Sequence, residues 1–279
     1  NYTELLWFFE GFTSYYDDLL LRRAGLLDNA GYLKLLNKTL NQVLQAPGRR
    51  VQSVAQASFD AWVKYYRQDE NTPNATISYY TKGALVALCF DLTLRRASAH
   101  GPAVTLDDAM RGLWARCAGG PMSEADFAAV LHECTHRSFA PEIAAWIHGK
   151  GELPLRTLLQ QHGVGVADDT AQLAQRLGLR VSESGGIHVK TVLRGGAAER
   201  AGLAAGDEWL GIEVGKVGWR LTRLDDLPLY AGTAPRVTAL VSRDKRLLRL
   251  PLRLPRESTT WRLSARDATA VNAWLSPGD

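Results

Sequence analysis

The strongest constraint in this sequence is a change of pattern at Gly149-Lys150-Gly151. Before these residues, apolar side chains recur every three or four positions, which is the spacing of amphipathic helices. After them, glycines become frequent and apolar residues gather in short runs, which is typical of strands. The sequence therefore predicts an α+β multidomain protein: a helical domain over residues 1–151, a β-rich domain with its leading junction over 152–256, and a tail with a short strand and helix over 257–279.

Apolar periodicity predicts the individual helices of the first domain. A Ser or acidic residues mark the expected starts of the last two helices, and basic residues or Pro-Gly follow the first two. The expected helices cover residues 5–21, 30–44, 53–66 and 76–96, run from 106 to 115, and begin at 123.

The second domain is expected to consist of short strands. The apolar runs that indicate them cover residues 179–181, 187–193, 209–214, 237–241 and 247–254. Residues 255–258 are expected to form a linker, followed by a possible strand over 259–263 and a closing helix over 267–275.

Composition excludes several classes of protein. The net charge of +4 comes from Lys and Arg residues interspersed with Asp and Glu, which does not favour nucleic-acid binding. No run approaches the roughly 20 apolar residues that a membrane helix needs. Cys89, Cys117 and Cys134 form no C-x-x-C pair, which favours free thiols in a reducing compartment. We therefore expect a cytoplasmic protein with no membrane partner, although a removed signal peptide would be compatible with this start.

The first predicted helix contains a lone carboxylate, Glu10, among Trp7, Phe8, Phe9 and Phe12. Burying an ionised carboxylate beside such rings costs several kcal/mol unless a cation, a metal or hydrogen bonds offset it. Either Glu10 pairs locally at a helix surface, or it has a specific partner.

Two stretches closely resemble the glycyl aminopeptidase family of gluzincin zinc metallopeptidases. They are residues 5–16, with Glu10-Gly11 at their centre, and residues 78–83, with Tyr80-Thr81-Lys82-Gly83. Glu152-Leu153-Pro154-Leu155 looks like the junction of that family. The resemblance implies that the first domain is the α-helical half of a thermolysin-like catalytic domain, and that the whole protein releases N-terminal glycine or small residues from peptides.

The same resemblance assigns roles to two residues. Glu10 matches the third zinc ligand, which together with two histidines of an H-E-x-x-H helix leaves the metal positive enough to acidify its bound water. The rings around Glu10 would then exclude water. Tyr80 matches the tyrosine that donates to the tetrahedral oxyanion, with Tyr79 as the adjacent alternative. A tyrosine that only packs in the core would also account for either residue.

The family's H-E-x-x-H lies some tens of residues before the glutamate, whereas only nine residues precede Glu10 here. We therefore expect a C-terminal fragment that lacks the metal histidines and the general base. Zinc would be the cofactor of the full-length enzyme, whereas the fragment would bind none and be inactive. Glu10 should lie near a surface that the absent half would cover.

One H-E-x-x-H is present, at His132-Glu133-Cys134-Thr135-His136. By motif alone it is a zinc-peptidase signature. At 100° per residue, however, both histidines lie opposite the apolar stripe that contains Phe127 and Leu131. We therefore interpret it as an exposed helix face, with adventitious metal binding as the alternative.

The second domain resembles a PDZ domain in the permuted strand order of bacteria, on the signature at residues 195–207. The resemblance implies that Gly178, Leu179, Arg180 and Val181 form a carboxylate-binding loop and the first groove strand, with a helix near 224–230 as the other wall. A peptide C-terminus would be the partner there, unless the domain only braces the enzyme. The alternative for the whole chain is a non-catalytic, peptide-binding adaptor with a helical scaffold.

Overall fold

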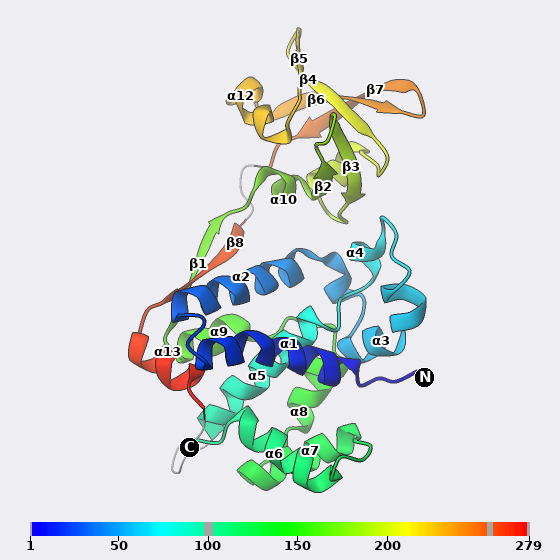
Figure 1. The fold of residues 1–279 in the computed structure, drawn as a ribbon. Coiled ribbons are helices and arrows are strands. Elements are labelled where there is room, and N and C mark those ends of the chain that lie inside the picture. The colour runs from blue at the N-terminus through cyan, green and yellow to red at the C-terminus, as the bar shows by residue number, and fades with distance from the viewer. Residues whose placement is uncertain (1, 98–102, 256–258, 278–279) are drawn as a thin grey trace.

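The computed structural model describes residues 2–97, 103–255 and 259–277. These residues form two bodies, a larger helical body and a smaller β body, with separate hydrophobic cores. A two-stranded ribbon joins the bodies along one side (Figure 1). The prediction of a mixed protein with a helical part followed by a β-rich part is confirmed at this level.

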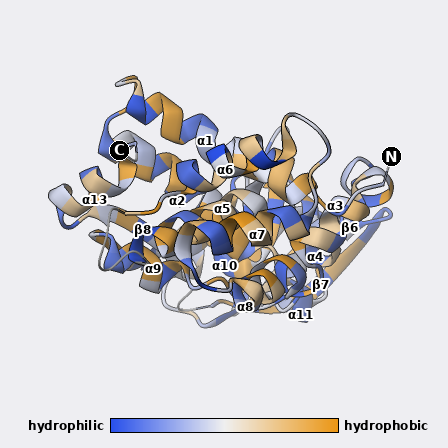
Figure 2. Ribbon diagram, turned by 90° about the horizontal axis from the view of Figure 1, so that it is seen from below, coloured by the Kyte–Doolittle hydropathy of each residue, from blue (hydrophilic) through white to orange (hydrophobic). Residues whose placement is uncertain are grey.

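In the helical body, the other helices pack around the central helix α5 (Thr81–Ala97). Its elements are α1 (Leu6–Arg23), α2 (Asn29–Gln45), η1 (Pro47–Arg50), α3 (Val54–Phe59), η2 (Ala61–Tyr65), α4 (Thr72–Ala75), α5 (Thr81–Ala97), α6 (Leu106–Cys117), α7 (Glu124–Thr135), α8 (Ala140–Ile143), η3 (Ala144–His148) and α9 (Leu155–Gln161). Orange and blue segments alternate along the outer helices, as expected for helices with one buried face (Figure 2). The central helix α5 is different, because almost every side chain from Lys82 to Leu94 is buried.

Local sequence signals explain four of the helix starts. Asp28 caps α2, and Ser53, Thr105 and Ser123 form reciprocal capping boxes at α3, α6 and α7. Two predicted helices differ from the structure. The segment over 53–66 divides at Asp60 into α3 and the π-helical turn η2, and the helix predicted from 76 begins only at Thr81.

The β body is built on an antiparallel sheet with strand order β2-β3-β4-β6-β7, where β5 pairs with β4. Its elements are α10 (Leu173–Leu177), β2 (Leu179–Ser182), β3 (Ile187–Val192), α11 (Ala197–Ala201), β4 (Glu208–Val214), β5 (Val217–Arg220), η4 (Leu224–Asp226), α12 (Leu227–Ala231), β6 (Arg236–Arg243) and β7 (Arg246–Arg253). Each of the five predicted runs coincides with a strand, although Leu193 and Leu254 lie one residue beyond β3 and β7. The exposed strand β5 was missed because it is only four residues long, Val217–Arg220, and contains just two apolar side chains.

The connecting ribbon pairs β1 (Val164–Thr170) with β8 (Thr259–Ala265), and the chain ends in α13 (Ala268–Leu275). Val164, Val166 and Trp274 are buried in the core of the helical body. The segments that flank the β body therefore pack on the helices. Residues 256–258 of the predicted 255–258 linker lie outside the described residues.

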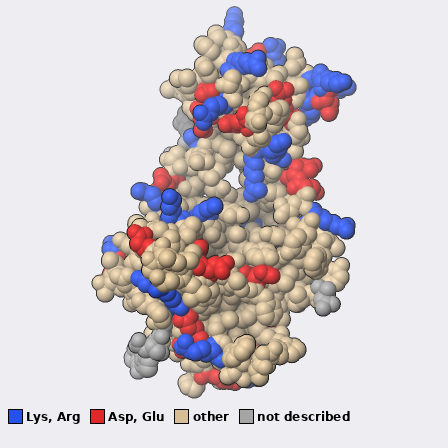
Figure 3. Space-filling model, viewed as in Figure 1, with Lys and Arg blue, Asp and Glu red and all other residues tan. Residues whose placement is uncertain are grey.

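A second contact joins the bodies on the side away from the ribbon. Asn74 of α4 donates from Nδ2 to the Val192 carbonyl at 2.9 Å and accepts at Oδ1 from the Arg194 backbone N–H at 2.8 Å. The junction is thus held at one end by the β1–β8 ribbon and at the other by Asn74. A hollow lies between these two contacts, with Lys and Arg side chains at its margins (Figure 3). Within the described residues, no helix is long and apolar enough to cross a membrane.

Candidate active site

Helices α1 and α5 cross in direct backbone contact at two glycines. A Cβ atom on Gly11 would lie 2.6 Å from the Gly83 Cα, and one on Gly83 would lie 2.7 Å from the Trp7 carbonyl oxygen. No side chain fits in these gaps. The glycine after Glu10 and the glycine after Lys82 therefore have one purpose: they let the two helices approach closely enough to bring their flanking residues together.

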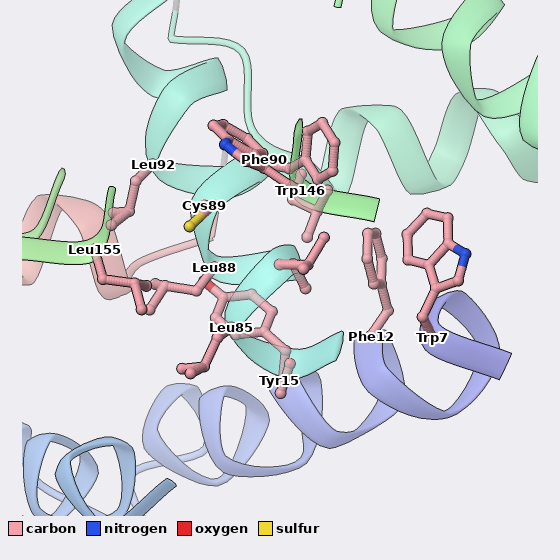
Figure 4. Packing of buried hydrophobic residues seen from close by; sticks show 14 of the residues in the cluster. Trp7, Phe12, Tyr15, Leu85, Leu88, Cys89, Phe90, Leu92, Trp146 and Leu155 are labelled. Atoms are coloured by element: carbon pink, nitrogen blue, oxygen red, sulfur yellow. The ribbon is translucent and has the colours of Figure 1, made fainter. Parts of the chain in front are cut away.

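Buried contacts on both sides of the crossing keep the helices in register. Phe12 and Tyr15 of α1 point toward Leu85 and Leu88 of α5 in the core (Figure 4). The Tyr15 hydroxyl donates to the buried Asp91 carboxylate at 2.7 Å. Asp91 also accepts from Arg95 within α5, from the Leu106 backbone N–H and from the indole of Trp274. This carboxylate is thus fully hydrogen-bonded and has a structural role.

Glu10 lies on the half-buried face of α1 next to the crossing. Among the described residues, its carboxylate has no hydrogen bond and no ion pair. Its negative charge acts on Tyr80, so the two residues are electrostatic neighbours although seventy positions separate them. Glu10 therefore remains a carboxylate available for a partner.

The rings that flank Glu10 in sequence do not enclose it. Trp7, Phe8 and Phe12 pack in the core against Phe127, while Phe9 is 49% exposed. Residues two positions away on a helix point to nearly opposite sides, so Phe8 and Phe12 lie behind Glu10. The predicted dry aromatic shell from these residues was wrong.

Tyrosines from other segments lie beside Glu10 instead. Tyr80 sits in the turn before α5, with its ring 4.7 Å from that of Tyr79 and 5.7 Å from that of Tyr65. Burial, a hydrogen bond with Tyr66 and the charge of Glu10 raise the pKa of Tyr80 to about 12. Its phenol stays protonated at neutral pH and can donate a hydrogen bond. Tyr79 is only 1% exposed, so Tyr80 is the more accessible of the pair.

Sequence reasoning missed Tyr65 and Tyr66. The π-helical turn η2 directs them toward the turn at residues 79–80, where the Tyr79 and Tyr66 hydroxyls lie 3.5 Å apart. Trp62 stacks on Tyr66 at 5.1 Å, and both are more than half exposed. The only sequence signal was three aromatic residues within five positions, at 62, 65 and 66, followed by a polar loop.

Lys82, in the same motif, is a buried cation at 2% exposure. Its ammonium donates to the Arg49 carbonyl at 3.3 Å. Burial lowers its pKa to about 8, against the opposing effect of Glu152, whose carboxylate forms ion pairs with Arg49 and Arg50. Lys82 therefore belongs to the contact between α5 and η1. Its ammonium binds a backbone carbonyl rather than solvent.

The H-E-x-x-H at 132–136 has a different environment. His132, Glu133 and His136 are exposed, and Glu133 is paired with Arg116 at 3.0 Å. His136 is the left-handed cap of α7, with φ 57°, so it no longer continues the helical face of His132. Across residues 2–97, 103–255 and 259–277, no group of three or more His, Cys, Asp or Glu side chains could hold a metal ion.

Gly178, Leu179, Arg180 and Val181 line a cleft of about 820 Å³ between the two bodies. The opposite wall of the cleft is formed by α2 and η1 of the helical body, and the helix near 224–230 does not line it. Gly178 adopts φ 75° and packs against the backbone of Gly196, which explains the need for glycine at both positions.

Comparisons with known proteins relate this chain to aminopeptidases. Residues 1–86, which include Glu10 and Tyr80, match the family described as M61 glycyl aminopeptidase. A comparison with curated proteins found no match. The chain is similar to the crystal structure of an aminopeptidase N family protein from Idiomarina loihiensis, with 33% sequence identity and a TM-score of 0.87.

That match covers 99% of this chain and 49% of the other, so the chain spans about half the length of the structure it resembles. The predicted similarity to an aminopeptidase family is confirmed. The zinc motif and the PDZ assignment are finer predictions that these matches do not test.

Proposed function

We propose that this chain is the C-terminal part of a zinc-dependent aminopeptidase of the gluzincin type, which releases N-terminal glycine or small residues from peptides. The observation that carries the proposal is the glycine-to-glycine crossing that brings Glu10 beside Tyr80. Both motifs lie within the residues that match the M61 glycyl aminopeptidase family. The solved aminopeptidase-family structure is about twice as long as this chain, which leaves room for ligands outside these 279 residues.

Of the residues at the crossing, Glu10 could supply one ligand of a metal site. Peptidases of the M61 family are generally zinc-dependent. Glu10 offers a half-buried carboxylate without a hydrogen bond or ion pair among the described residues, which fits a single metal ligand. When bound there, zinc would supply a Lewis acid beside the substrate carbonyl. The remaining ligands would come from an H-E-x-x-H outside this chain.

The role of Tyr80 follows from its protonation. With a pKa raised to about 12, its hydroxyl is a hydrogen-bond donor at neutral pH. A donor placed where negative charge develops on a carbonyl oxygen stabilises the transition state more than the ground state. Tyr65 and Tyr79 pack against the Tyr80 ring, and Tyr66 interacts with its hydroxyl, so the donor is oriented before substrate binds.

The test uses the complete natural protein and a chromogenic substrate with N-terminal glycine. Tyr80→Phe should lower kcat by about 10²–10³ with zinc content unchanged, as expected for the loss of one oxyanion donor. Glu10→Gln should lower zinc content. Tyr230→Phe in the β body and Glu133→Gln on α7 are matched controls and should keep both activity and metal. Full activity of Tyr80→Phe, or full zinc content of Glu10→Gln, would refute the assignment.

A second candidate function is peptide binding by the β body, which we propose to be a PDZ domain of the permuted bacterial order. The edge strand β2 and the preceding Gly178 turn favour it, because an extended peptide can add to an unpaired strand edge. Gly178, Leu179, Arg180 and Val181 would contact the peptide. A peptide-binding adaptor without catalysis remains the alternative to the enzyme, and the activity assay distinguishes the two.

A further inference from the structure

The cleft between the two bodies has the character of a binding site. It has a volume of about 820 Å³, and it lies between the β1–β8 ribbon on one side and the Asn74 contact on the other. The hydrogen bonds of Asn74 fix the distance between its walls. A cleft that is held open at both ends can accept a ligand without rearrangement of the two bodies.

One wall of the cleft is a strand edge. Four consecutive residues, Gly178 to Val181, line it. Gly178 is the left-handed residue before β2, and the pairing of β2 with β3 shifts register between Arg180 and Val181, so regular strand alternation is interrupted there. The strand β2 has β3 as its one neighbour within the described sheet. The other edge of β2 is therefore available for pairing with an extended peptide, and residues of the same strand line the cleft.

The charge of the cleft is strongly one-sided. Arginines from both bodies line it, whereas none of its lining residues is acidic. The arginines are Arg49, Arg50, Arg176, Arg180 and Arg194. Glu152 offsets part of this charge through its ion pairs with Arg49 and Arg50. Arg180 and Arg194 are exposed and have no acidic partner among the described residues. A cleft lined by one sign of charge concentrates ligands of the opposite sign.

We propose that this cleft binds an extended acidic peptide segment, which pairs with the edge of β2 and places its carboxylate side chains against arginines of both bodies. The inference rests on the second candidate function and extends it in two ways. The helical body supplies half of the site through α2 and η1, and the ligand is recognised by acidic side chains rather than by its terminal carboxylate alone.

The experiment measures binding of capped heptapeptides to the 279-residue chain by isothermal titration calorimetry. One peptide alternates Val with Glu, a second alternates Val with Gln, and a third alternates Val with Lys. The Glu peptide should bind at least tenfold more tightly than the Gln peptide, the Lys peptide should not bind, and added salt should weaken the Glu complex. Equal affinity for the Glu and Gln peptides would overturn the proposal.

Charge reversal locates the site. Arg180→Glu, Arg194→Glu and, on the helical wall, Arg50→Glu should each lower the affinity for the Glu peptide at least tenfold. Arg220→Glu, an exposed arginine of β5 outside the cleft, is the matched control and should leave it unchanged. Equal losses in the control and the cleft variants would mean that the peptide binds by net charge alone, which contradicts the proposal. Circular dichroism verifies that the variants are folded.

Two further probes separate this inference from the function on which it rests. If a Gln peptide with a free C-terminus binds as tightly as the Glu peptide, peptide binding stands but recognition of acidic side chains is wrong. If no peptide binds, both fail. Displacement of the Glu peptide by an equal concentration of inorganic phosphate or of a short single-stranded oligonucleotide would also overturn the proposal, because the cleft would then recognise phosphate.

Discussion

Two regions of this molecule resemble sequence motifs of peptidases, and their structural environments differ. Glu10-Gly11 and Tyr80–Gly83 are seventy residues apart, yet α1 and α5 cross so closely that Glu10 and Tyr80 interact. The H-E-x-x-H at 132–136 is contiguous, yet its histidines are exposed and His136 has left the helical conformation. The difference shows that a sequence motif is good evidence of a functional site only when the packing around it depends on the residues of the motif.

The first prediction tests the backbone contact between α1 and α5, on which this comparison depends most. Gly83→Val places side-chain atoms where the Trp7 carbonyl oxygen and the Gly11 Cα lie within 2.7 and 2.9 Å of a Cβ. Because both obstacles are backbone, the helices must separate, and we expect a loss of 3 kcal/mol or more, roughly, in the free energy of unfolding. Denaturant titration measures this loss.

Gly151→Val is the control for that variant, because a Cβ at Gly151 meets nothing within 4 Å. It should change stability by less than about 0.5 kcal/mol. Equal stability of the two variants would show that the crossing tolerates a side chain and that the glycine in the motif has another purpose.

The second prediction concerns the buried cation within the same motif. Lys82 has a pKa lowered by burial to about 8, so its charged form destabilises the folded state. Below pH 8 the lysine is charged in both states and the full penalty applies. Between pH 8 and the unfolded pKa near 10.5 the unfolded state binds more protons, and stability rises with pH. Lys82→Met should therefore be more stable than the native protein by about 3 kcal/mol at pH 7, and this advantage should disappear toward pH 10.5.

Denaturant titrations of both proteins across pH 6.5–10.5 check this prediction. Lys38→Met, at an exposed lysine of α2, should give a difference that does not vary with pH. A constant difference for Lys82→Met would mean that the ammonium is solvated, and that the Tyr80–Gly83 motif contains no buried charge.

The third prediction addresses how the β body supports the Tyr80 side of the first region. Asn74 lies in the loop between Tyr66 and Tyr80, and its side chain makes both hydrogen bonds to the β body. Asn74→Ala leaves a carbonyl and an N–H unpaired and should cost about 1–3 kcal/mol. Hydrogen exchange should accelerate at residues 66–80 and 192–196. Glu70→Ala, at an exposed residue of the same segment, should not change exchange at 192–196. Identical profiles of the two variants would contradict the role of Asn74.

The sequence predicted helix boundaries well where the apolar periodicity agrees with the packing of the helix. The predicted starts and ends of α1, α2 and α6, and the predicted start of α7, lie within two residues of the structure, because apolar stripes, caps or basic residues mark them. The Glu10–Tyr80 pair could be predicted only through resemblance, since no local pattern reveals which helices cross. The roles of Tyr66 and Asn74 could not be predicted from the sequence. A π-helical turn and a contact between two bodies depend on tertiary packing rather than on the spacing of residues.

The smallest effects are expected at the contiguous motif. Because His136 has φ 57°, a conformation that glycine adopts without strain, His136→Gly should stabilise the protein by about 0.5–1 kcal/mol. His132→Gln, on the exposed face, should stay within about 0.5 kcal/mol of the native protein. Zinc should not raise the Tm of the native chain. An increase in Tm that either substitution abolishes would mean that the two histidines bind metal together. The contrast between a motif required by packing and one that is only contiguous would then no longer hold.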